Sequence, residues 1–261
     1  MTILDEIAAY TRKRVEVAKE KISLSELKDK AFSIKKGDFP FEKALRKPDI
    51  SFILECKKAS PSKGIIAENF EPLLIAKDYE KIGADAVSVL TEPKYFLGRD
   101  EYLKEIAGEI KIPVLRKDFT VDEYMLYEAK ILGASAVLLI VSILSEKQLG
   151  DYLKICNSLG LSALVEVHDE NEAKTAVSSG AKIIGVNNRN LKDFSVDTRN
   201  SANLREKIPA EILFVSESGV KNSDDIKNLI NIGADAVLIG ETMMKAEDKQ
   251  ATFSMLKQGL S

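Results

Sequence analysis

The amino-acid sequence predicts one closed barrel of eight parallel strands, in which strands and helices alternate along the chain. Three observations support this fold class: a repeated motif, eight regularly spaced apolar runs, and helix-start motifs between the runs. The repeated motif, Gly-Ala-x-Ala-Val, begins at Gly83, Gly133 and Gly233, and a weaker copy begins at Gly180. A glycine in this position is typical of the residue that ends a helix, and the β-branched residues after it are typical of a buried parallel strand.

The apolar runs start about every 26 residues, as expected for a repeated strand–helix unit. Eight such units satisfy a closed barrel, whereas a doubly wound sheet usually has about five or six strands and a glycine-rich phosphate turn. Neither G-x-G-x-x-G nor G-x-x-x-x-G-K-[ST] occurs. We therefore expect a TIM barrel with strands at residues 52–57, 86–91, 113–117, 136–142, 163–167, 183–187, 212–217 and 236–240.

Amphipathic stretches with helix-start motifs lie between these runs. T-x-x-E at Thr120 and S-x-x-Q at Ser145 are capping boxes, and D-x-x-E at Asp169 is a similar cap. These motifs place helix starts after three of the predicted strands.

Residues 1–48 precede the repeat and read as a helical extension. Ser23, in S-x-x-E, opens a second helix there. We expect a single domain, with the extension at 1–48 and the barrel at 49–261. The first helix is indicated by residues that recur at helical spacing, namely Leu4, Ala8, Thr11, Val15 and Ala18.

Composition excludes several classes of protein. Of the 261 residues, 45% are hydrophobic and 30% charged, which is typical of a globular chain with a sizeable core. The net charge of −3 comes from 38 basic and 41 acidic residues that are interspersed, so nucleic acid is not an expected partner. No apolar run has the length of a membrane span or the form of a signal peptide, and we expect a cytoplasmic protein with no membrane partner.

The two cysteines, Cys56 and Cys156, belong to no CxxC motif or Cys/His cluster, which favours unpaired thiols in a reducing compartment. His168 is the only histidine, and its position before a predicted helix favours a solvated or cap-side role over catalysis. One histidine and no G-x-S-x-G argue against a serine hydrolase and against a His-rich metal site.

Charged and polar residues gather at the carboxyl ends of the predicted strands, where TIM barrels place their active sites. Taken singly, each is more often a solvated or ion-paired residue. Together they would shift one another's pKa values, as proton-transfer chemistry requires. Period-two alternation places Glu55 and Lys57 in the mouth and turns Cys56 outward. The other strand-end residues are Glu92, Lys117, Asp118, Glu166, His168, Asn187, Arg189, Glu217, Ser218 and Gly240.

Two loops are candidates for phosphate binding. Ser218-Gly219 and Gly240-Glu241 follow the seventh and eighth predicted strands, where backbone amides often hold phosphate, although ordinary tight turns are an equal alternative. The polar loop at residues 60–64, after the first strand, is suited to closing over an anion.

Read together, the strand ends resemble the indole-3-glycerol phosphate synthase family over nearly the whole chain. The resemblance implies that 1-(2-carboxyphenylamino)-1-deoxyribulose 5-phosphate closes to indole-3-glycerol phosphate with loss of carbon dioxide and water, without a metal or organic cofactor. It also implies a small phosphorylated substrate as partner, and we expect a monomer. The segments that carry it are ILECKKASPSKGII at 53–66, LRKDF at 115–119, LVEVH at 164–168, IGVNNRNL at 184–191 and SESG at 216–219.

The resemblance also implies a role for each matching residue. Lys117 is the general acid and Lys57 the second lysine, Glu166 is the base, Glu55 orients a lysine, and Asn187 holds the substrate. Lysine suits the acid role if carboxylates keep it charged. The matching substrate-binding residues are Ser60, Phe119, Leu138, Arg189 and Glu217, and the phosphate-binding residues are Ser218, Gly219, Gly240 and Glu241.

The sequence departs from the family pattern at two positions, and two alternative functions remain to be considered. Glu241 stands where some members have serine, so its carboxylate leaves only the backbone amide for phosphate, and Met125 stands where glutamine is common, on a helix facing away from the site. A phosphate-binding isomerase barrel, such as phosphoribosylanthranilate isomerase, would share the late glycines but lack the lysine and glutamate set. A catalytically inactive scaffold barrel would have lost a lysine or Glu166, and neither is lost.

Overall fold

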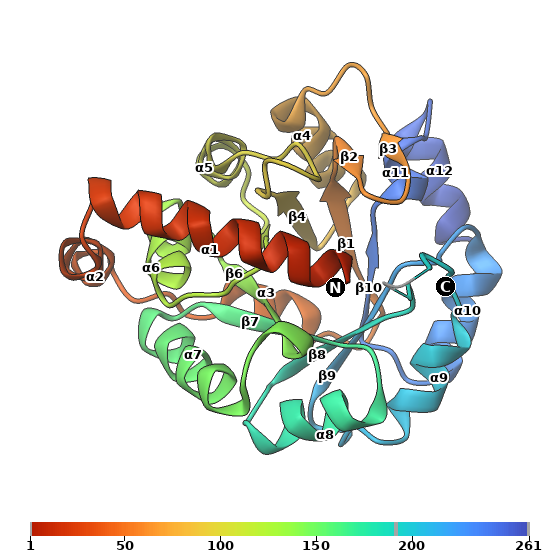
Figure 1. Ribbon diagram of the computed structural model, residues 1–261. Helices are drawn as coiled ribbons and strands as arrows, with labels where there is room; N and C mark the ends of the chain where they lie inside the picture. The colour runs from red at the N-terminus through yellow and green to blue at the C-terminus, as the bar shows by residue number, and fades with distance from the viewer. Residues whose placement is uncertain (1, 191–192, 260–261) are drawn as a thin grey trace.

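The computed structural model describes residues 2–190 and 193–259 and contains a closed barrel of parallel strands in the order β1-β10-β9-β8-β7-β6-β5-β4 (Figure 1). The barrel closes on β1, where Ile53 pairs with Leu238 of β10 on one side and with Ala86 of β4 on the other. The strands are β1 (Ser51–Cys56), β4 (Ala86–Leu90), β5 (Val114–Lys117), β6 (Ala136–Ile140), β7 (Ser162–Val167), β8 (Ile183–Asn187), β9 (Leu213–Glu217) and β10 (Ala236–Ile239).

Helices alternate with these strands and surround the barrel (Figure 1). The predicted eightfold TIM barrel is thereby confirmed. The helices are α4 (Pro72–Ile82), α5 (Asp100–Glu109), α6 (Tyr124–Ile131), α7 (Glu146–Leu159), α8 (Glu170–Ser178), α9 (Arg199–Arg205), α10 (Ser223–Asn231), α11 (Glu241–Met244) and α12 (Lys249–Leu256). No helix among the described residues is long and apolar enough to cross a membrane.

Three helices precede the barrel: α1 (Ile3–Lys21), α2 (Leu24–Ser33) and α3 (Pro40–Leu45). The Oγ of Ser23 accepts the backbone N–H of Glu26 at 3.2 Å and caps α2, as predicted. The amino end of α1 lies over the carboxyl ends of the strands, whereas α3 covers the opposite end of the barrel, where the Glu42 N–H donates to Ser162 Oγ.

Two apolar layers form the core. The inner layer fills the barrel and continues into the extension through Leu4 and Ile7 of α1 and Phe41 and Leu45 of α3. The outer layer lies between strands and helices and contains Cys56, whose outward direction was predicted. Both cysteines are free and buried.

The helix starts follow the predictions with one exception. Ser145 and Asp169 cap α7 and α8, each accepting an N–H of the first turn. The predicted cap at Thr120 is wrong: α6 begins at Tyr124, and Asp122 Oδ1 instead accepts the Tyr124 N–H at 2.9 Å. Thr120 is buried in the loop after β5, so its side chain is not placed at a helix end.

Two other local features differ from the predicted strands. The strand predicted at 136–142 ends at Ile140, because Val141–Ile143 forms a 3-10 turn after β6. The loop after β1 forms a small antiparallel hairpin from β2 (Ala59–Ser60) and β3 (Gly64–Ile65). This hairpin holds the polar 60–64 segment beside the barrel mouth.

Candidate active site

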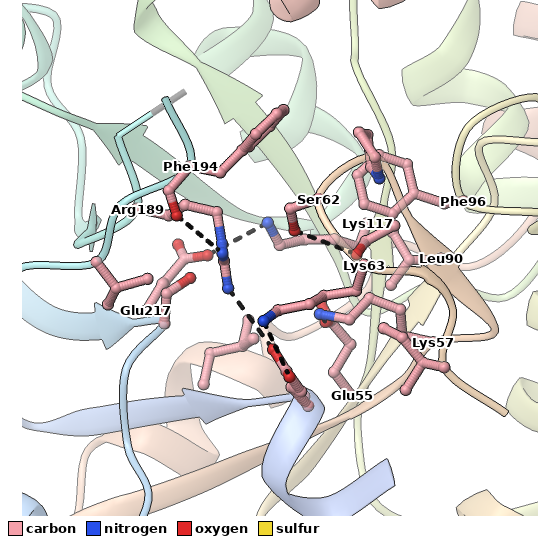
Figure 2. A pocket seen from close by; sticks show the side chains of 18 of the residues that line it. Glu55, Lys57, Ser62, Lys63, Leu90, Phe96, Lys117, Arg189, Phe194 and Glu217 are labelled. Atoms are coloured by element: carbon pink, nitrogen blue, oxygen red, sulfur yellow. Dashed lines mark hydrogen bonds and ion pairs between the residues drawn. The ribbon is translucent and has the colours of Figure 1, made fainter. Parts of the chain in front are cut away.

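A cavity of about 530 Å³ opens at the carboxyl ends of the strands (Figure 2). All but one of the predicted site residues line it; the exception, Asn187, lies behind the wall and contacts the residues that form it. Sequence reasoning did not assign Phe96 and Phe194 to this wall, nor Ile3, Leu4 and Ile7 of α1.

Lys117 ends β5 and forms the centre of an ion-paired cluster. Its Nζ lies 3.0 Å from Glu166 Oε2 and 3.2 Å from Glu217 Oε2, and its side chain is 13% exposed. Burial alone would lower the pKa of Lys117, but the nearby carboxylates of Glu166, Glu217 and Glu55 outweigh burial and raise it. Lys117 is therefore held as an ammonium group on the cavity wall.

Glu166 of β7 is held by donors on both carboxylate oxygens. Lys117 donates to Oε2, and Asn187 Nδ2 donates to Oε1 at 3.2 Å. Burial would raise the pKa of Glu166, but the charge of Lys117 and the adjacent His168 lower it well below its usual range. Glu166 is therefore a carboxylate able to accept a proton.

Glu217 of β9 is the carboxyl that departs from this pattern. It is 2% exposed, and its Oε1 has no hydrogen-bond partner among the described residues. Burial and the charge of Glu166 outweigh the attraction of Lys117 and raise its pKa to about 7. A Cβ at Gly185 would collide with Glu217 Oε1, so glycine there leaves space for this side chain.

The second lysine, Lys57, pairs with Glu55 at the other side of the cluster. Its Nζ donates to Glu55 Oε1 at 2.6 Å, and the Ser88 hydroxyl lies 3.5 Å from Glu55 Oε2. A Cβ at Gly240 would collide with Glu55 Oε1 and come within 2.7 Å of Lys57 Nζ. The glycine at the end of β10 therefore leaves room for this ion pair.

His168 contacts the cluster, contrary to the prediction of a solvated side chain. Its Nδ1 lies 3.0 Å from Glu172 Oε2, and its Nε2 lies 3.3 Å from Glu166 Oε1. The cap-side expectation is confirmed, because the His168 N–H donates to Glu172 Oε2 at 2.8 Å just before α8. Burial would lower the pKa of His168, but the adjacent carboxylates of Glu166 and Glu172 raise it to about 10.

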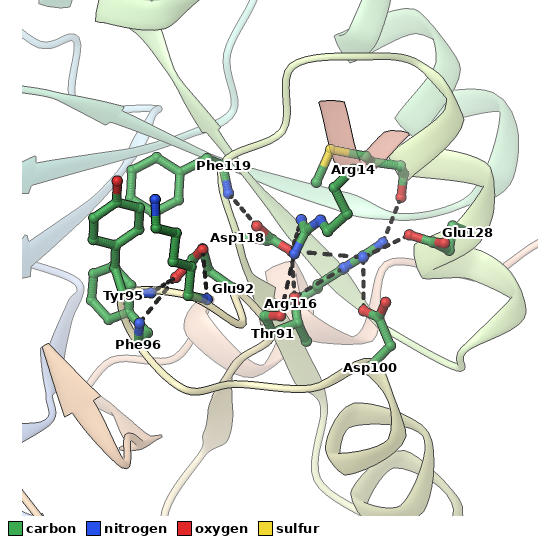
Figure 3. Close-up of polar contacts among 12 residues, drawn as sticks. Arg14, Thr91, Glu92, Tyr95, Phe96, Asp100, Arg116, Asp118, Phe119 and Glu128 are labelled. Carbon is green, nitrogen blue, oxygen red and sulfur yellow. Dashed lines mark hydrogen bonds and ion pairs between the residues drawn. The ribbon is translucent and has the colours of Figure 1, made fainter. Parts of the chain in front are cut away.

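Apolar side chains cover the wall beside Lys117. The rings of Phe96 and Phe119 lie 5.9 Å apart at 39°, and Leu138 of β6 is buried next to the same space. Glu92 positions Phe96 rather than entering the chemistry: its carboxylate accepts N–H groups of the 94–96 loop at 2.7–3.0 Å (Figure 3).

Asp118, next to Lys117, belongs to a buried ion network behind the cavity (Figure 3). Its Oδ1 accepts the Phe119 N–H at 2.8 Å, and its Oδ2 accepts Arg14 of α1 and the Thr91 hydroxyl, both at 2.7 Å. Arg116, 2% exposed, adds pairs with Asp100 and Glu128 at 2.8 and 2.7 Å. This network connects α1, α5 and α6 to the strand that carries Lys117.

The other end of the cavity is suited to an anion. Ser218 and Gly219 have positive φ angles of 67° and 105°, and the N–H groups of Gly219 and Val220 have no hydrogen-bond partner in the described part of the chain. Ser218 Oγ donates to Asn187 Oδ1 at 3.0 Å.

Glu241 shares this end with three basic side chains. It forms a 2.7 Å pair with Lys245 and lies 3.8 Å from Lys63 and 3.9 Å from Arg189. The guanidinium of Arg189 also donates to the Phe194 carbonyl at 3.2 Å. Its side chain therefore connects the loop after β8 with the carboxylate of Glu241.

The fold and the site together define a TIM-barrel enzyme of proton-transfer chemistry with an anionic substrate. The family model for indole-3-glycerol phosphate synthase matches residues 4–256. The chain therefore belongs to the indole-3-glycerol phosphate synthase family. Its activity is that of a carboxy-lyase of tryptophan biosynthesis, and the alternative of an isomerase with the same fold finds no support in this match.

Individual relatives agree with the family match. Proteins named indole-3-glycerol phosphate synthase from Ruminiclostridium cellulolyticum and Leuconostoc mesenteroides are 55% and 50% identical over 256 and 258 residues, and each alignment covers 98% of both chains. Among solved structures, a thiamine phosphate pyrophosphorylase from Pyrococcus furiosus superimposes with a TM-score of 0.61. That match covers 84% of this chain and 97% of the other at 17% identity, so it supports the fold alone.

Proposed function

We propose that Lys117 is the general acid that closes the indole ring. As the carboxylate-bearing carbon of the anthranilate ring attacks the sugar carbonyl, the carbonyl oxygen gains a proton, and carbon dioxide then leaves the ring. The observation that carries the proposal is the Lys117 ammonium on the cavity wall, paired with Glu166 and Glu217 at 3.0 and 3.2 Å. Carboxylates that keep the ammonium charged and oriented suit it to protonate a developing alkoxide.

Glu166 is the base that restores the aromatic ring after the hydroxyl group has left as water. Lys117 and Asn187 orient its two oxygens, which supports this role. Lys57 is the second acid and Glu55 orients it through the 2.6 Å pair, while Asn187 also positions Ser218. Two lysines in separate carboxylate environments can serve two protonation steps of the same reaction.

The anthranilate ring packs on Phe119 and Leu138, and Phe96 completes this apolar wall. Arg189 binds the substrate carboxylate, since a guanidinium is suited to a bidentate contact. Ser60 and Glu217 contribute polar groups to the cavity wall.

The phosphate binds at Ser218, Gly219, Gly240 and Glu241. The unpaired N–H groups of Gly219 and Val220 support this placement, because buried or partly buried N–H groups require an acceptor. Glu241 contributes only its backbone there, and its carboxylate stays with Lys245. Lys63, on the loop after β1, adds positive charge at the same end.

One assay tests the activity. Purified protein incubated with the carboxyphenylamino-deoxyribulose phosphate should produce indole fluorescence without added metal. Activity abolished by EDTA and restored by a divalent ion would contradict the absence of a cofactor. No product under any condition would favour the inactive scaffold. The monomeric state and the cytoplasmic location stay predictions.

A further inference from the structure

We infer that His168 is a positioning residue, which holds the Glu166 carboxylate in its orientation through a Glu172–His168–Glu166 relay. The inference rests on the role proposed for Glu166. It concerns a residue that the sequence pattern assigned to a helix cap and that the proposed reaction does not use.

The geometry places the imidazole between two carboxylates. Nδ1 lies 3.0 Å from Glu172 Oε2 and Nε2 lies 3.3 Å from Glu166 Oε1. The side chains of His168 and Glu172 are each 18% exposed and that of Glu166 is 3% exposed, so solvent screens these charges poorly. An imidazolium suits this arrangement, because each ring nitrogen has a carboxylate oxygen within ion-pair distance; Nδ1 forms a hydrogen bond, whereas Nε2 interacts with Glu166 through charge and without hydrogen-bond geometry.

The relay is anchored on a rigid element. Glu172 lies in the first turn of α8, where Asp169 caps its N–H at 2.9 Å, and its Oε2 also accepts the His168 N–H. From the α9 side, Asn200 Nδ2 donates to the His168 carbonyl at 3.2 Å. The ring therefore has little freedom to turn away from Glu166.

The relay supplies what Glu166 otherwise lacks. Lys117 holds Oε2, but Oε1 has only the neutral Asn187 amide besides His168. Without a charged imidazole, Oε1 would keep only the Asn187 amide, so the carboxylate would be held less firmly and would carry a higher pKa. The charged groups that face the ring are Glu166 from β7 and Glu172 from α8. Those that face Glu166 are His168, Lys117 from β5 and, across Lys117, the carboxyl group of Glu217 from β9.

The charge of the ring can be read directly, because His168 is the only histidine in the chain. NMR of the imidazole in the native protein should show a protonated ring throughout pH 6–8. Glu172→Gln removes one of the two anions and should lower the midpoint by about one to three pH units. Glu170→Gln is the matched control, since Glu170 lies in the same helical turn but pairs with Lys174 at 2.8 Å.

The value of kcat should depend on whether the His168 imidazole is protonated. In Glu172→Gln, kcat should fall as the pH rises through the lowered midpoint, whereas the native protein and Glu170→Gln should not show this fall. His168→Ala should lower kcat about 10- to 100-fold, because a small misplacement of a reacting group costs about that much, with KM changed far less. His168→Gln, which keeps an N–H donor, should recover part of the loss.

Two results would overturn the relay. One is a native imidazole that titrates near the ordinary value of 6.5. The other is kcat of His168→Ala within twofold of native, together with a Glu172→Gln profile that matches Glu170→Gln. A native protein that makes no product would instead contradict the proposed function, and the NMR measurement would still decide the charge of the ring.

Discussion

Single residues at the barrel mouth differ in protonation because their surroundings differ, although the side chains are chemically alike. Glu166 and Glu217 both pair with Lys117, yet the pKa of Glu166 is lowered and that of Glu217 is raised to about 7. The difference in pKa follows from the carboxylate oxygen that does not pair with Lys117. In Glu166 this oxygen faces His168 and Asn187, whereas in Glu217 it faces none of the described donors. Two carboxyl groups of one site can therefore differ in protonation state near neutral pH.

Replacing Lys117 with methionine should lower kcat by about 10²- to 10⁴-fold, because methionine fills similar volume but donates no proton. KM should change far less, since the lost interaction belongs to the transition state. Measuring kcat, KM and Tm on this variant separates catalysis from structure. If Lys117 only holds the mouth together, Tm falls and kcat stays within threefold of native.

Glu217→Gln should change how stability depends on pH. The folded-state pKa of Glu217, about 7, lies above its ordinary value of 4.5, so the folded protein binds an extra proton between these values. Stability from this group is therefore present below pH 4.5 and is lost as the pH rises toward 7. The lowered pKa of Glu166 acts only below this window. Melting curves from pH 5 to 8 should show a smaller fall in Tm for the variant; an identical fall would contradict the assignment.

Individual elements were predicted well where the signal is local. The repeated glycines, the alternating apolar runs and the caps at Ser145 and Asp169 all depend on residues within one turn or one strand of each other. The contact of His168 with Glu166 was missed because proximity to a helix start says nothing about which side the ring faces. Phe96 was missed for a similar reason, since its direction depends on Glu92 closing the loop around it.

The turn after β9 gives a prediction for one loop. Gly219 has a φ of 105°, and a Cβ there would lie 2.7 Å from Thr198 Cγ2. Gly219→Val should therefore shift the N–H groups proposed for phosphate and raise KM strongly with a smaller change in kcat. Gly180→Val is a control, because Gly180 has a similar φ of 87° but nothing near its Cβ position. Equal binding of substrate with and without its phosphate would show that the site is misassigned.

Across the whole molecule, the least predictable feature is where the N-terminal extension packs. The helical spacing in α1 indicates an apolar face, and Leu4, Ile7, Ala8, Thr11 and Val15 are indeed buried. No pattern in those residues says that the helix lies over the barrel mouth, because many surfaces accept an apolar face of this kind. The structure supplies the specific contact, in which Arg14 reaches Asp118 beside Lys117.

We propose that residues 1–48 and the barrel form one cooperative unit, with the Arg14–Asp118 pair as a principal connection. Asp118 is 1% exposed and Arg14 22%, so replacing Arg14 with methionine removes a charge-assisted hydrogen bond from a buried carboxylate and should cost about 1–3 kcal/mol. Thr91 and Arg116 still contact Asp118, which keeps the loss below that of an isolated buried charge. Hydrogen exchange then separates two outcomes. If the extension and the barrel unfold as one cooperative unit, the amides of α1 and of β5 lose equal protection in Arg14→Met. If the extension opens by itself, protection is lost in α1 alone and stays at its native value in β5.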